Sequence, residues 1–167
     1  LRLSRGGGDA APPAPPGDEV FALEGAAFRR RGAAATALRG VSVTLRRGEV
    51  LMVVGAVGSG KSTFLDALLG ELELASGTMT RAAGRVAYAP QAAWNVAGTV
   101  RENVVLGAPR GAPFDEGAYK AAVEAAALSD DVAEWPEGAD TEIGERGISL
   151  SGGQAARLAL ARVCYAC

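Results

Sequence analysis

The stretch Gly55-Ala56-Val57-Gly58-Ser59-Gly60-Lys61-Ser62 fits the pattern G-x-x-x-x-G-K-[ST], in which a glycine-rich loop cradles phosphate groups. An apolar run over residues 50–54 precedes the loop, and an amphipathic segment over residues 63–69 follows it. A buried strand, a glycine loop and a helix are the context that this motif requires. An ordinary glycine turn before a helix is the alternative, and the flanking strand and helix disfavour it.

The residue types in this loop suit phosphate binding. Its three glycines let the backbone take positive φ values and come close to an anion, and successive N–H groups then form a nest around it. The following helix adds its free amides and the positive end of its dipole. Lys61 is expected to reach the β- and γ-phosphates, and the Ser62 hydroxyl to ligate Mg²⁺. The candidate ligand-binding residues here are Gly55, Gly58, Ser59, Gly60, Lys61, Ser62 and Thr63.

The composition narrows the choice of partners. Of 167 residues, 17 are Lys or Arg and 19 are Asp or Glu, so the net charge is −2 and no basic patch suggests nucleic acid. No apolar run reaches the about 20 residues that a membrane-spanning helix needs, and no signal-peptide pattern is present. The sequence contains no histidine. Cys164 and Cys167 lack the second Cys or His pair of a zinc site, and we interpret their spacing as chance.

The first half of the chain is predicted to be a linker followed by strands. Residues 1–18 are rich in Gly, Pro and Ala and are predicted to be disordered. Apolar and alternating patterns predict strands over residues 20–28, 41–45, 50–54 and 85–89 and a short strand around Met79. We expect a hairpin between 41–45 and 50–54, turning at residues 47–49. Ser76-Gly77 is expected to form a turn.

The second half is predicted to be mainly helical. Thr99 and Asp115 are good N-caps, and Gly70 is a plausible C-terminal glycine for the helix after Lys61. Residues 136–147 are polar and contain glycine, which predicts a loop. The predicted helices cover residues 61–69, 100–106, 116–128, 129–135 and 155–165.

A second glycine-rich stretch, Leu150-Ser151-Gly152-Gly153-Gln154, precedes the last predicted helix. Ser151 can cap that helix, and the two glycines leave its first amides uncovered, which makes a second helix start suited to an anion. Taken alone, this stretch would predict only an N-cap for the last helix. Its position beyond the first glycine loop makes a second phosphate contact the better interpretation.

With both stretches, the sequence resembles the ATP-binding cassette (ABC) ATPases from about residue 20 to residue 167. Leu150–Gln154 matches that family's LSGGQ signature, which faces the opposite nucleotide through Ser151, Gly152, Gly153 and Gln154. Gln91 resembles the Q-loop glutamine, which in the family contacts Mg²⁺ and the attacking water and relays the nucleotide state to the membrane domain. An exposed loop amide is the alternative for Gln91.

The finer resemblance is to the first nucleotide-binding domain of the C subfamily, the multidrug-resistance-associated exporters. It is carried by the stretches 55–62, 67–72, 84–94, 99–107 and 141–147. In such exporters the segment before the signature lies near the transmembrane part, so Glu142 and Glu145 are candidates for interface contacts. A solvated acidic loop is an equally weighted alternative for both.

The resemblance implies an α/β fold, namely a P-loop NTPase core of the ABC type with an antiparallel β subdomain and a helical subdomain. The helical subdomain would cover about residues 95–157 within a partial domain at 19–167. ATP and Mg²⁺ are the implied cofactors, with Lys61 and Gln91 catalytic and Ser62 and Gln91 at the metal. The implied partners are a second nucleotide-binding domain and transmembrane domains, which would hold the chain at the cytoplasmic face of a membrane.

Three features depart from the family pattern. Arg30 stands where the family usually stacks the adenine on an aromatic ring, although a guanidinium can also stack on a base. Ala155-Ala156-Arg157 replaces the usual Lys/Arg-Gln-Arg. The sequence ends at Cys167, before the place of the Walker B strand, the catalytic glutamate and the H-loop histidine. We therefore expect these residues alone to bind ATP without useful turnover, and the strand at 50–54 to keep an unpaired edge that lowers solubility.

The leading functional hypothesis is ATP binding and, in a complete dimer, ATP hydrolysis that powers export across a membrane. An ATP-binding domain that regulates without hydrolysing, and a soluble ABC ATPase that is not a transporter, are the alternatives. The region around Trp94, the stretch 141–147 and the near-neutral charge disfavour the soluble ATPase.

Overall fold

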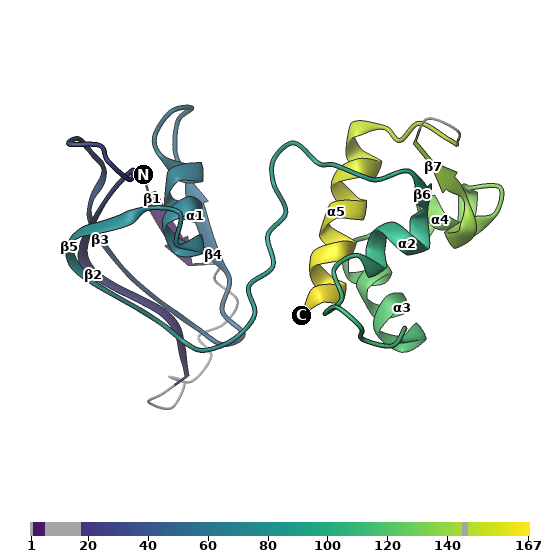
Figure 1. Ribbon diagram of the computed structural model, residues 1–167, viewed down its shortest axis with the longest axis horizontal. Coiled ribbons are helices and arrows are strands. Elements are labelled where there is room, and N and C mark those ends of the chain that lie inside the picture. Colours follow the sequence, from purple (N-terminus) through teal and green to yellow (C-terminus); the bar gives the residue numbers. More distant parts are fainter. Residues whose placement is uncertain (1, 6–17, 145–146) are drawn as a thin grey trace. The chain divides into compact units, whose positions relative to one another are not determined.

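A computed structural model describes residues 2–5, 18–144 and 147–167 (Figure 1). The contacts divide the chain into two units, Leu1–Gly84 and Arg85–Cys167. Each unit encloses its own cluster of buried apolar side chains. The first unit carries the loop at 55–60, and the second carries Gln91 and the Leu150–Gln154 stretch.

The first unit is built on a three-stranded antiparallel sheet. Its strands are β2 (Glu19–Arg29), β3 (Thr36–Arg46) and β5 (Glu73–Arg81), with β2 in the centre. Leu23 on β2 pairs with Val43 on β3 and with Met79 on β5. The strand predicted at 20–28 is thus confirmed, while those predicted at 41–45 and around Met79 are parts of longer strands.

Gly77 lies inside β5, so the predicted turn at Ser76-Gly77 is wrong. Its φ of +78° and a shift of register between Glu24 and Ala27 mark an irregularity in the pairing of β2 with β5. A Cβ atom on Gly77 would lie 2.5 Å from the carbonyl oxygens of Glu24 and Gly25. Glycine is needed here because two backbones approach closely, and not because the chain reverses.

The strand that leads into the glycine loop is β4 (Leu51–Val54), and it is followed by α1 (Lys61–Leu69), which ends at Gly70 as predicted. The predicted hairpin between β3 and β4 is wrong, because β3 pairs with β2 while β4 pairs antiparallel with β1 (Arg2–Arg5). β1 falls in the segment that the sequence predicts to be a disordered linker. Apart from Asp18, the rest of that segment lies outside the described residues.

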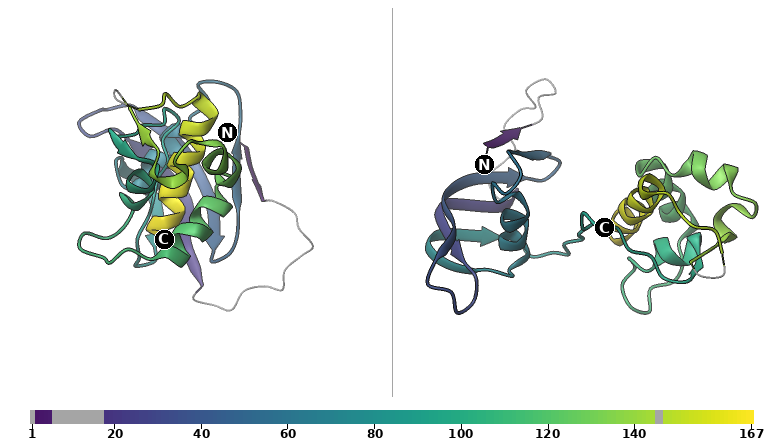
Figure 2. Two further views of the ribbon diagram at one scale, coloured as in Figure 1. Left: turned by 90° about the vertical axis from the view of Figure 1, so that its right-hand side faces the viewer. Right: turned by 90° about the horizontal axis from the view of Figure 1, so that it is seen from above.

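The core of the first unit fixes α1 against one face of the sheet, as the views in Figures 1 and 2 show. Phe64 and Ala67 of α1 are buried in the same cluster as Leu23 and Phe28 of β2. Leu51 and Val53 of β4 pack against this cluster and are partly buried. Burial of α1 and β4 in one core therefore holds the loop between them at both ends.

The second unit is a helical bundle with a small two-stranded sheet. Its long helix α5 (Gly152–Ala166) packs on α2 (Val100–Val105) and α3 (Glu116–Ala125). α4 (Ser129–Glu134) and a 3₁₀ turn, η1 (Gly138–Asp140), follow α3. β6 (Gly98–Thr99) pairs antiparallel with β7 (Glu142–Ile143), so the predicted loop at 136–147 contains short ordered elements.

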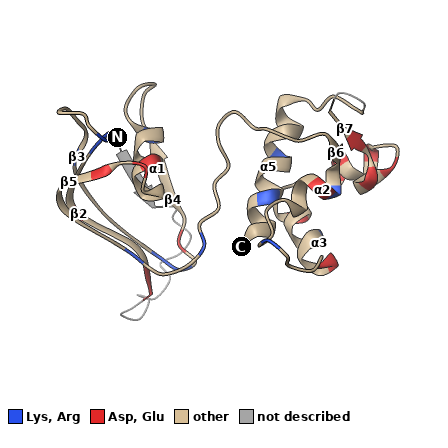
Figure 3. Ribbon diagram, in the orientation of Figure 1, with Lys and Arg blue, Asp and Glu red and all other residues tan. Residues whose placement is uncertain are grey.

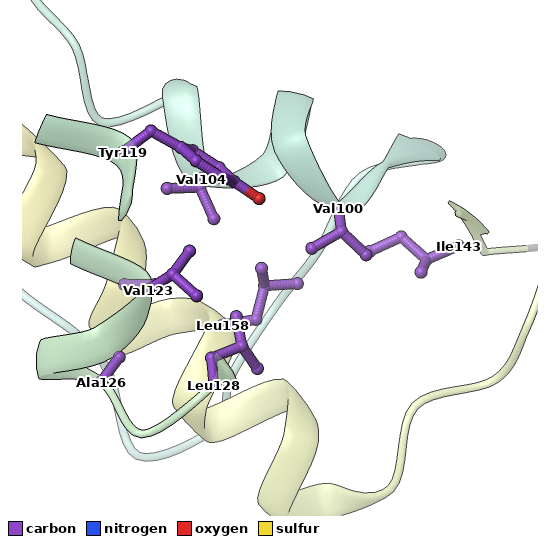
Figure 4. Packing of buried hydrophobic residues seen from close by; sticks show 9 residues of the cluster. Val100, Val104, Tyr119, Val123, Ala126, Leu128, Ile143 and Leu158 are labelled. Carbon is purple, nitrogen blue, oxygen red and sulfur yellow. The ribbon is translucent and has the colours of Figure 1, made fainter. Parts of the chain in front are cut away.

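The buried cluster of this unit joins its helices to β7. Val100 and Val104 from α2, Val123 from α3 and Leu158 from α5 meet in it (Figure 4). Ile143 of β7 is 1% exposed and belongs to the same cluster. The cluster therefore fixes the N-terminal half of α5 relative to the helices and to β7.

Helix ends in this unit follow their local signals. Thr99, Asp115 and Ser151 each accept a backbone hydrogen bond as N-caps, which confirms the first two predicted caps and the possible cap at Ser151. α3 ends before the predicted residue 128 because Ala127 takes a φ of +51°, which breaks the helix. α2 is likewise one residue shorter than predicted, with Leu106 as its C-cap.

The strand predicted at residues 85–89 is absent from the described structure, where residues 85–90 are irregular. None of the described strands pairs with this segment. Val86 and Tyr88 are 43% and 44% exposed, so the apolar residues of this alternating pattern are not buried in a core. An alternating pattern of side chains forms a strand only where another strand pairs with it, and the pattern itself does not show whether such a partner is present.

Candidate functional site

The loop between β4 and α1 has the backbone conformation of an anion-binding turn. Gly58 and Gly60 have φ values of +79° and +94°, which confirms the expectation for these two glycines. Gly55 is not among the described glycines with positive φ, so that expectation was wrong for it. A Cβ atom on Gly60 would also lie 3.1 Å from Leu38 Cδ2, so both conformation and space favour glycine.

The first turn of α1 leaves donors available at this loop. The first backbone hydrogen bond of the helix runs from Phe64 N to Gly60 O, at 2.8 Å. The amides of Lys61, Ser62 and Thr63 precede it and are the donors that a helix leaves unpaired at its N-terminus. Ser59 Oγ is buried and has no hydrogen-bond partner among the described residues. These groups together form a cluster of donors at the start of α1.

Lys61 lies over this loop. Its Nζ donates to the carbonyl oxygens of Gly55 and Ala56, at 2.9 and 2.8 Å. Within the described residues, no carboxylate forms an ion pair with Lys61, so its charge is balanced only by carbonyl dipoles. The ammonium therefore holds the loop closed and remains available to a stronger anionic partner.

The start of α5 is a second cluster of open donors. Ser151 and Gln154 form a capping box, in which Gln154 N donates to Ser151 Oγ at 3.2 Å and Ser151 N donates to Gln154 Oε1 at 2.9 Å. The first backbone bond of the helix is that of Ala155 N to Ser151 O, so the amides of Gly152 and Gly153 precede it. A Cβ atom on Gly152 would meet nothing within 4 Å, so this helix start is open to an incoming ligand.

Asp131 of α4 forms hydrogen bonds with two side chains in the first two turns of α5. Its Oδ2 accepts from Arg157 Nε at 2.7 Å, and its Oδ1 accepts from Arg157 Nη2 at 2.9 Å and from Gln154 Nε2 at 3.2 Å. The hydrogen bond from Arg157 lowers the pKa of Asp131 below its ordinary value. Figure 3 shows basic residues on α5 and acidic residues around α4 and β7.

A buried cation joins α5 to α2 and to the segment after Gln91. Arg162 is 8% exposed, and its guanidinium carbon lies 3.9 Å from the centre of the Trp94 ring. Arg162 donates to the backbone oxygens of Asn103 and Trp94 and to Asn103 Oδ1, at 2.8, 3.1 and 3.2 Å. Burial lowers the pKa of Arg162 below its ordinary value. The Asn103 side chain also bonds the backbone of Val96 and Thr99, so it organises the entry to α2.

The remaining predicted residues lie on exposed segments. Gln91 is exposed in the irregular segment 85–97 of the second unit, and Arg30 is exposed directly after β2 in the first unit. Glu142 is exposed on β7, whereas Glu145 lies outside the described residues. Cys164 and Cys167 are exposed and not disulfide-bonded.

Sequence reasoning missed Asp131, Asn103 and Arg162, which organise the second unit. Arg157 was noted only as the one cation retained after the signature. Its partner could have been sought among acidic residues of the neighbouring predicted helix, where both Asp130 and Asp131 occur. No local pattern distinguishes the exposed Asp130 from the partly buried Asp131.

The donors present fit a phosphate-bearing ligand and a hard cation held mostly by that ligand. In the first unit, Ser62 at the start of α1 supplies a hydroxyl oxygen for such a cation. Mg²⁺ ordinarily takes few protein ligands and completes its shell with phosphates and water. Among the described residues, no group of three or more His, Cys, Asp or Glu side chains could hold a metal ion without such a ligand.

A glycine loop between a strand and a helix, with a lysine lying over it from the start of that helix, is typical of a P-loop nucleotide-binding protein. Residues 38–166 match the family described as ABC transporter, and the chain belongs to that family.

The known relatives of this chain include members of the C subfamily. The chain is 47% identical over 128 residues to an ABC-type transporter of Zymoseptoria tritici and 45% identical over 131 residues to the cystic fibrosis transmembrane conductance regulator of Danio rerio. It is 43% identical over 128 residues to ATP-binding cassette sub-family C member 2 of Mus musculus. These matches cover 77%, 78% and 77% of the chain, but only 9%, 8% and 8% of the respective relatives. The predicted resemblance to the C subfamily is confirmed.

In the part of the chain that the structure describes, no helix combines the length and the apolar character that crossing a membrane requires.

Proposed function

We propose that this chain is an ATP-binding domain of a C-subfamily ABC exporter. The loop at residues 55–63 would bind the phosphates of ATP, and Ser151–Gln154 would face the ATP held by a second such domain. The observation that carries this proposal is the pair of helix starts with open amides, at α1 and α5, in a chain of this family. Hydrolysis in the complete dimer would power transport across a membrane.

The residues of the loop would make different contacts with the phosphates. The amides of Lys61, Ser62 and Thr63 would hold the β- and γ-phosphate oxygens, and Lys61 Nζ would exchange its bonds to Gly55 and Ala56 for a phosphate oxygen. Ser62 would ligate Mg²⁺, which when bound would supply positive charge to the phosphates, and the family resemblance gives Gln91 the same role. Arg30 would stack on the adenine base from its exposed position after β2.

The signature residues are suited to a γ-phosphate on the opposite nucleotide. Because Ser151 Oγ already accepts from Gln154 N, its hydroxyl proton is free to donate. The amides of Gly152 and Gly153 add two donors beside it. Such fixed donors stabilise the charge that develops on a transferring phosphoryl group.

An ATP-binding domain that regulates without hydrolysing is the second candidate. The observations that favour it are the exposed Arg30 in place of an aromatic ring and the alanines at 155 and 156 after the signature. In both candidates the chain binds ATP and works beside transmembrane domains at the cytoplasmic face of a membrane. The difference between them is turnover.

The sequence provides a matched pair of lysines to test ATP binding. Lys61 and Lys120 are its only lysines, and Lys120 is exposed on α3, where it pairs with Glu116. We expect Lys61→Ala to weaken Mg–ATP binding to the chain about tenfold to a hundredfold, because a hydrogen bond to a charged group contributes about 1.5–3 kcal/mol. Isothermal titration calorimetry measures the affinity, and Lys120→Ala is the control.

Equal affinity in wild type and Lys61→Ala, with both variants folded by circular dichroism, would contradict ATP binding at this loop. Turnover separates the two candidates. In the full-length natural protein, ATP hydrolysis above the rate of Lys61→Ala supports the exporter motor, and ATP binding without such hydrolysis supports the regulatory domain.

A further inference from the structure

The side chain of Gln154 is held in one orientation from two sides. Its Oε1 accepts from Ser151 N at 2.9 Å, and its Nε2 donates to Asp131 Oδ1 at 3.2 Å. A reversed amide would place a donor against Ser151 N–H and an acceptor against a carboxylate. The bond from Asp131 therefore selects the orientation that the capping box needs.

Asp131 is itself fixed by α5. Arg157, one turn further along that helix, donates to both carboxylate oxygens at 2.7 and 2.9 Å. The Asp131 side chain is 12% exposed, so these bonds are shielded from solvent more than an ordinary surface pair. A Cβ atom on Gly153 would lie 3.4 Å from Arg157 Nη1, so this arginine also lies beside the signature backbone.

We propose that Asp131 is a positioning residue for the signature, holding Gln154 so that the turn at Ser151–Gln154 presents its hydroxyl and amides to a nucleotide phosphate. This inference rests on the proposed function of that turn. Asp131 touches no substrate in this role, because it acts only through Gln154 and Arg157. Without it, Gln154 is free to rotate, and the donors at Ser151, Gly152 and Gly153 lose their common direction.

A reversal of one hydrogen bond tests this role. In Asp131→Asn, the new amide has a single oxygen. With its NH₂ group at the place of Oδ1 it faces the donors Gln154 Nε2 and Arg157 Nη2, and with its NH₂ group at the place of Oδ2 it faces the donor Arg157 Nε, so either orientation sets two donors together and loosens the contact that holds Gln154. Gln154→Glu keeps the capping box, since glutamate is a normal partner in it, but places two carboxylates together. The double variant restores the bond with donor and acceptor exchanged. Asp130→Asn, at the exposed neighbouring carboxylate, is the matched control.

The measurements are Mg–ATP affinity of the chain and ATP hydrolysis by the full-length natural protein. We expect Asp131→Asn to keep the affinity, which depends on Lys61 in the first unit, and to lower kcat about tenfold. We expect Gln154→Glu to lower kcat as well, and the double variant to recover most of the loss. Asp130→Asn is expected to match wild type.

The proposal is overturned if Asp131→Asn hydrolyses ATP as fast as Asp130→Asn, or if the double variant recovers nothing. Wild-type hydrolysis no faster than that of Lys61→Ala would instead contradict the motor function itself. Hydrogen exchange then decides the positioning role. Faster exchange at the Gln154 and Ala155 amides in Asp131→Asn than in Asp130→Asn supports it, and equal exchange overturns it.

Discussion

Arg162 is a buried guanidinium whose partners are an aromatic ring and oxygens of neutral groups. The ring of Trp94 covers one face, and Asn103 and the Trp94 carbonyl accept its hydrogen bonds. A planar cation with several donors suits this arrangement, whereas a lysine ammonium could not make all of these contacts. Arg162 thereby links α5 to α2 and to the segment that follows Gln91.

We expect Arg162→Ala to lower the free energy of unfolding by about 2–4 kcal/mol, because it leaves buried oxygens unsatisfied and removes the stack on Trp94. Arg162→Lys should recover only part of this loss. Urea denaturation followed by circular dichroism measures the change. Arg110→Ala, at an exposed arginine, is the control. Equal stability of the Arg162→Ala and Arg110→Ala proteins would contradict the role described for this cation.

At the level of single residues, local motifs were predictable and tertiary partners were not. The loop glycines and Lys61 follow from a pattern of eight consecutive residues. Asp131 reaches residues 23 and 26 positions away, and Arg162 reaches residues 59 and 68 positions away. Such pairings depend on how helices pack, which no short window of sequence contains.

Among the elements, α2 is a short helix that is held at its start by an N-cap residue, Thr99. It has six residues, yet it buries Val100, Asn103 and Val104. Thr99 and Glu102 form a capping box at its start, with bonds of 3.1 and 2.8 Å. A helix this short has little stability of its own, so the cap and the core together keep it formed.

We expect Thr99→Ala to lower the free energy of unfolding by about 1 kcal/mol, since it removes the oxygen that caps Glu102 N. Thr99→Ser keeps that oxygen and should stay close to wild type. Thermal denaturation followed by circular dichroism compares the two. A loss in Thr99→Ser as large as in Thr99→Ala would assign the effect to the lost methyl group.

The contrast between local motifs and tertiary partners also explains which helices and strands could be predicted from the sequence. Helix starts at Thr99, Asp115 and Ser151 depend on bonds within three residues, and all three caps are present. Strands depend on partners elsewhere in the chain. The segment 85–89 therefore failed to form the predicted strand, and β4 pairs with a segment predicted to be disordered.

Over the whole molecule, a net charge of −2 gives little electrostatic repulsion between copies. Apolar side chains near the glycine loop are exposed, with Val50, Met52 and Val54 at 69%, 55% and 40%. Leu51 and Val53 point to the core cluster, so β4 is apolar on both faces and only one face is covered. This is the arrangement that favours association between chains.

We expect Met52→Lys to raise the highest soluble concentration of the chain and to lower self-association in sedimentation velocity, because a lysine on an exposed strand face opposes pairing. Leu160→Lys, at a half-exposed leucine on α5, adds the same charge elsewhere and serves as the control. An equal gain from both variants would assign the effect to net charge alone.

The neutral surroundings of Arg162 have a consequence for ionic strength. Among the described residues, no carboxylate lies within ion-pair distance of this guanidinium. Mobile ions screen exposed ion pairs such as Arg29–Glu73 in the first unit, but they hardly reach a buried cation held by a ring and carbonyl oxygens. The link between α5 and the segment after Gln91 should thus keep its strength across a wide range of salt concentration.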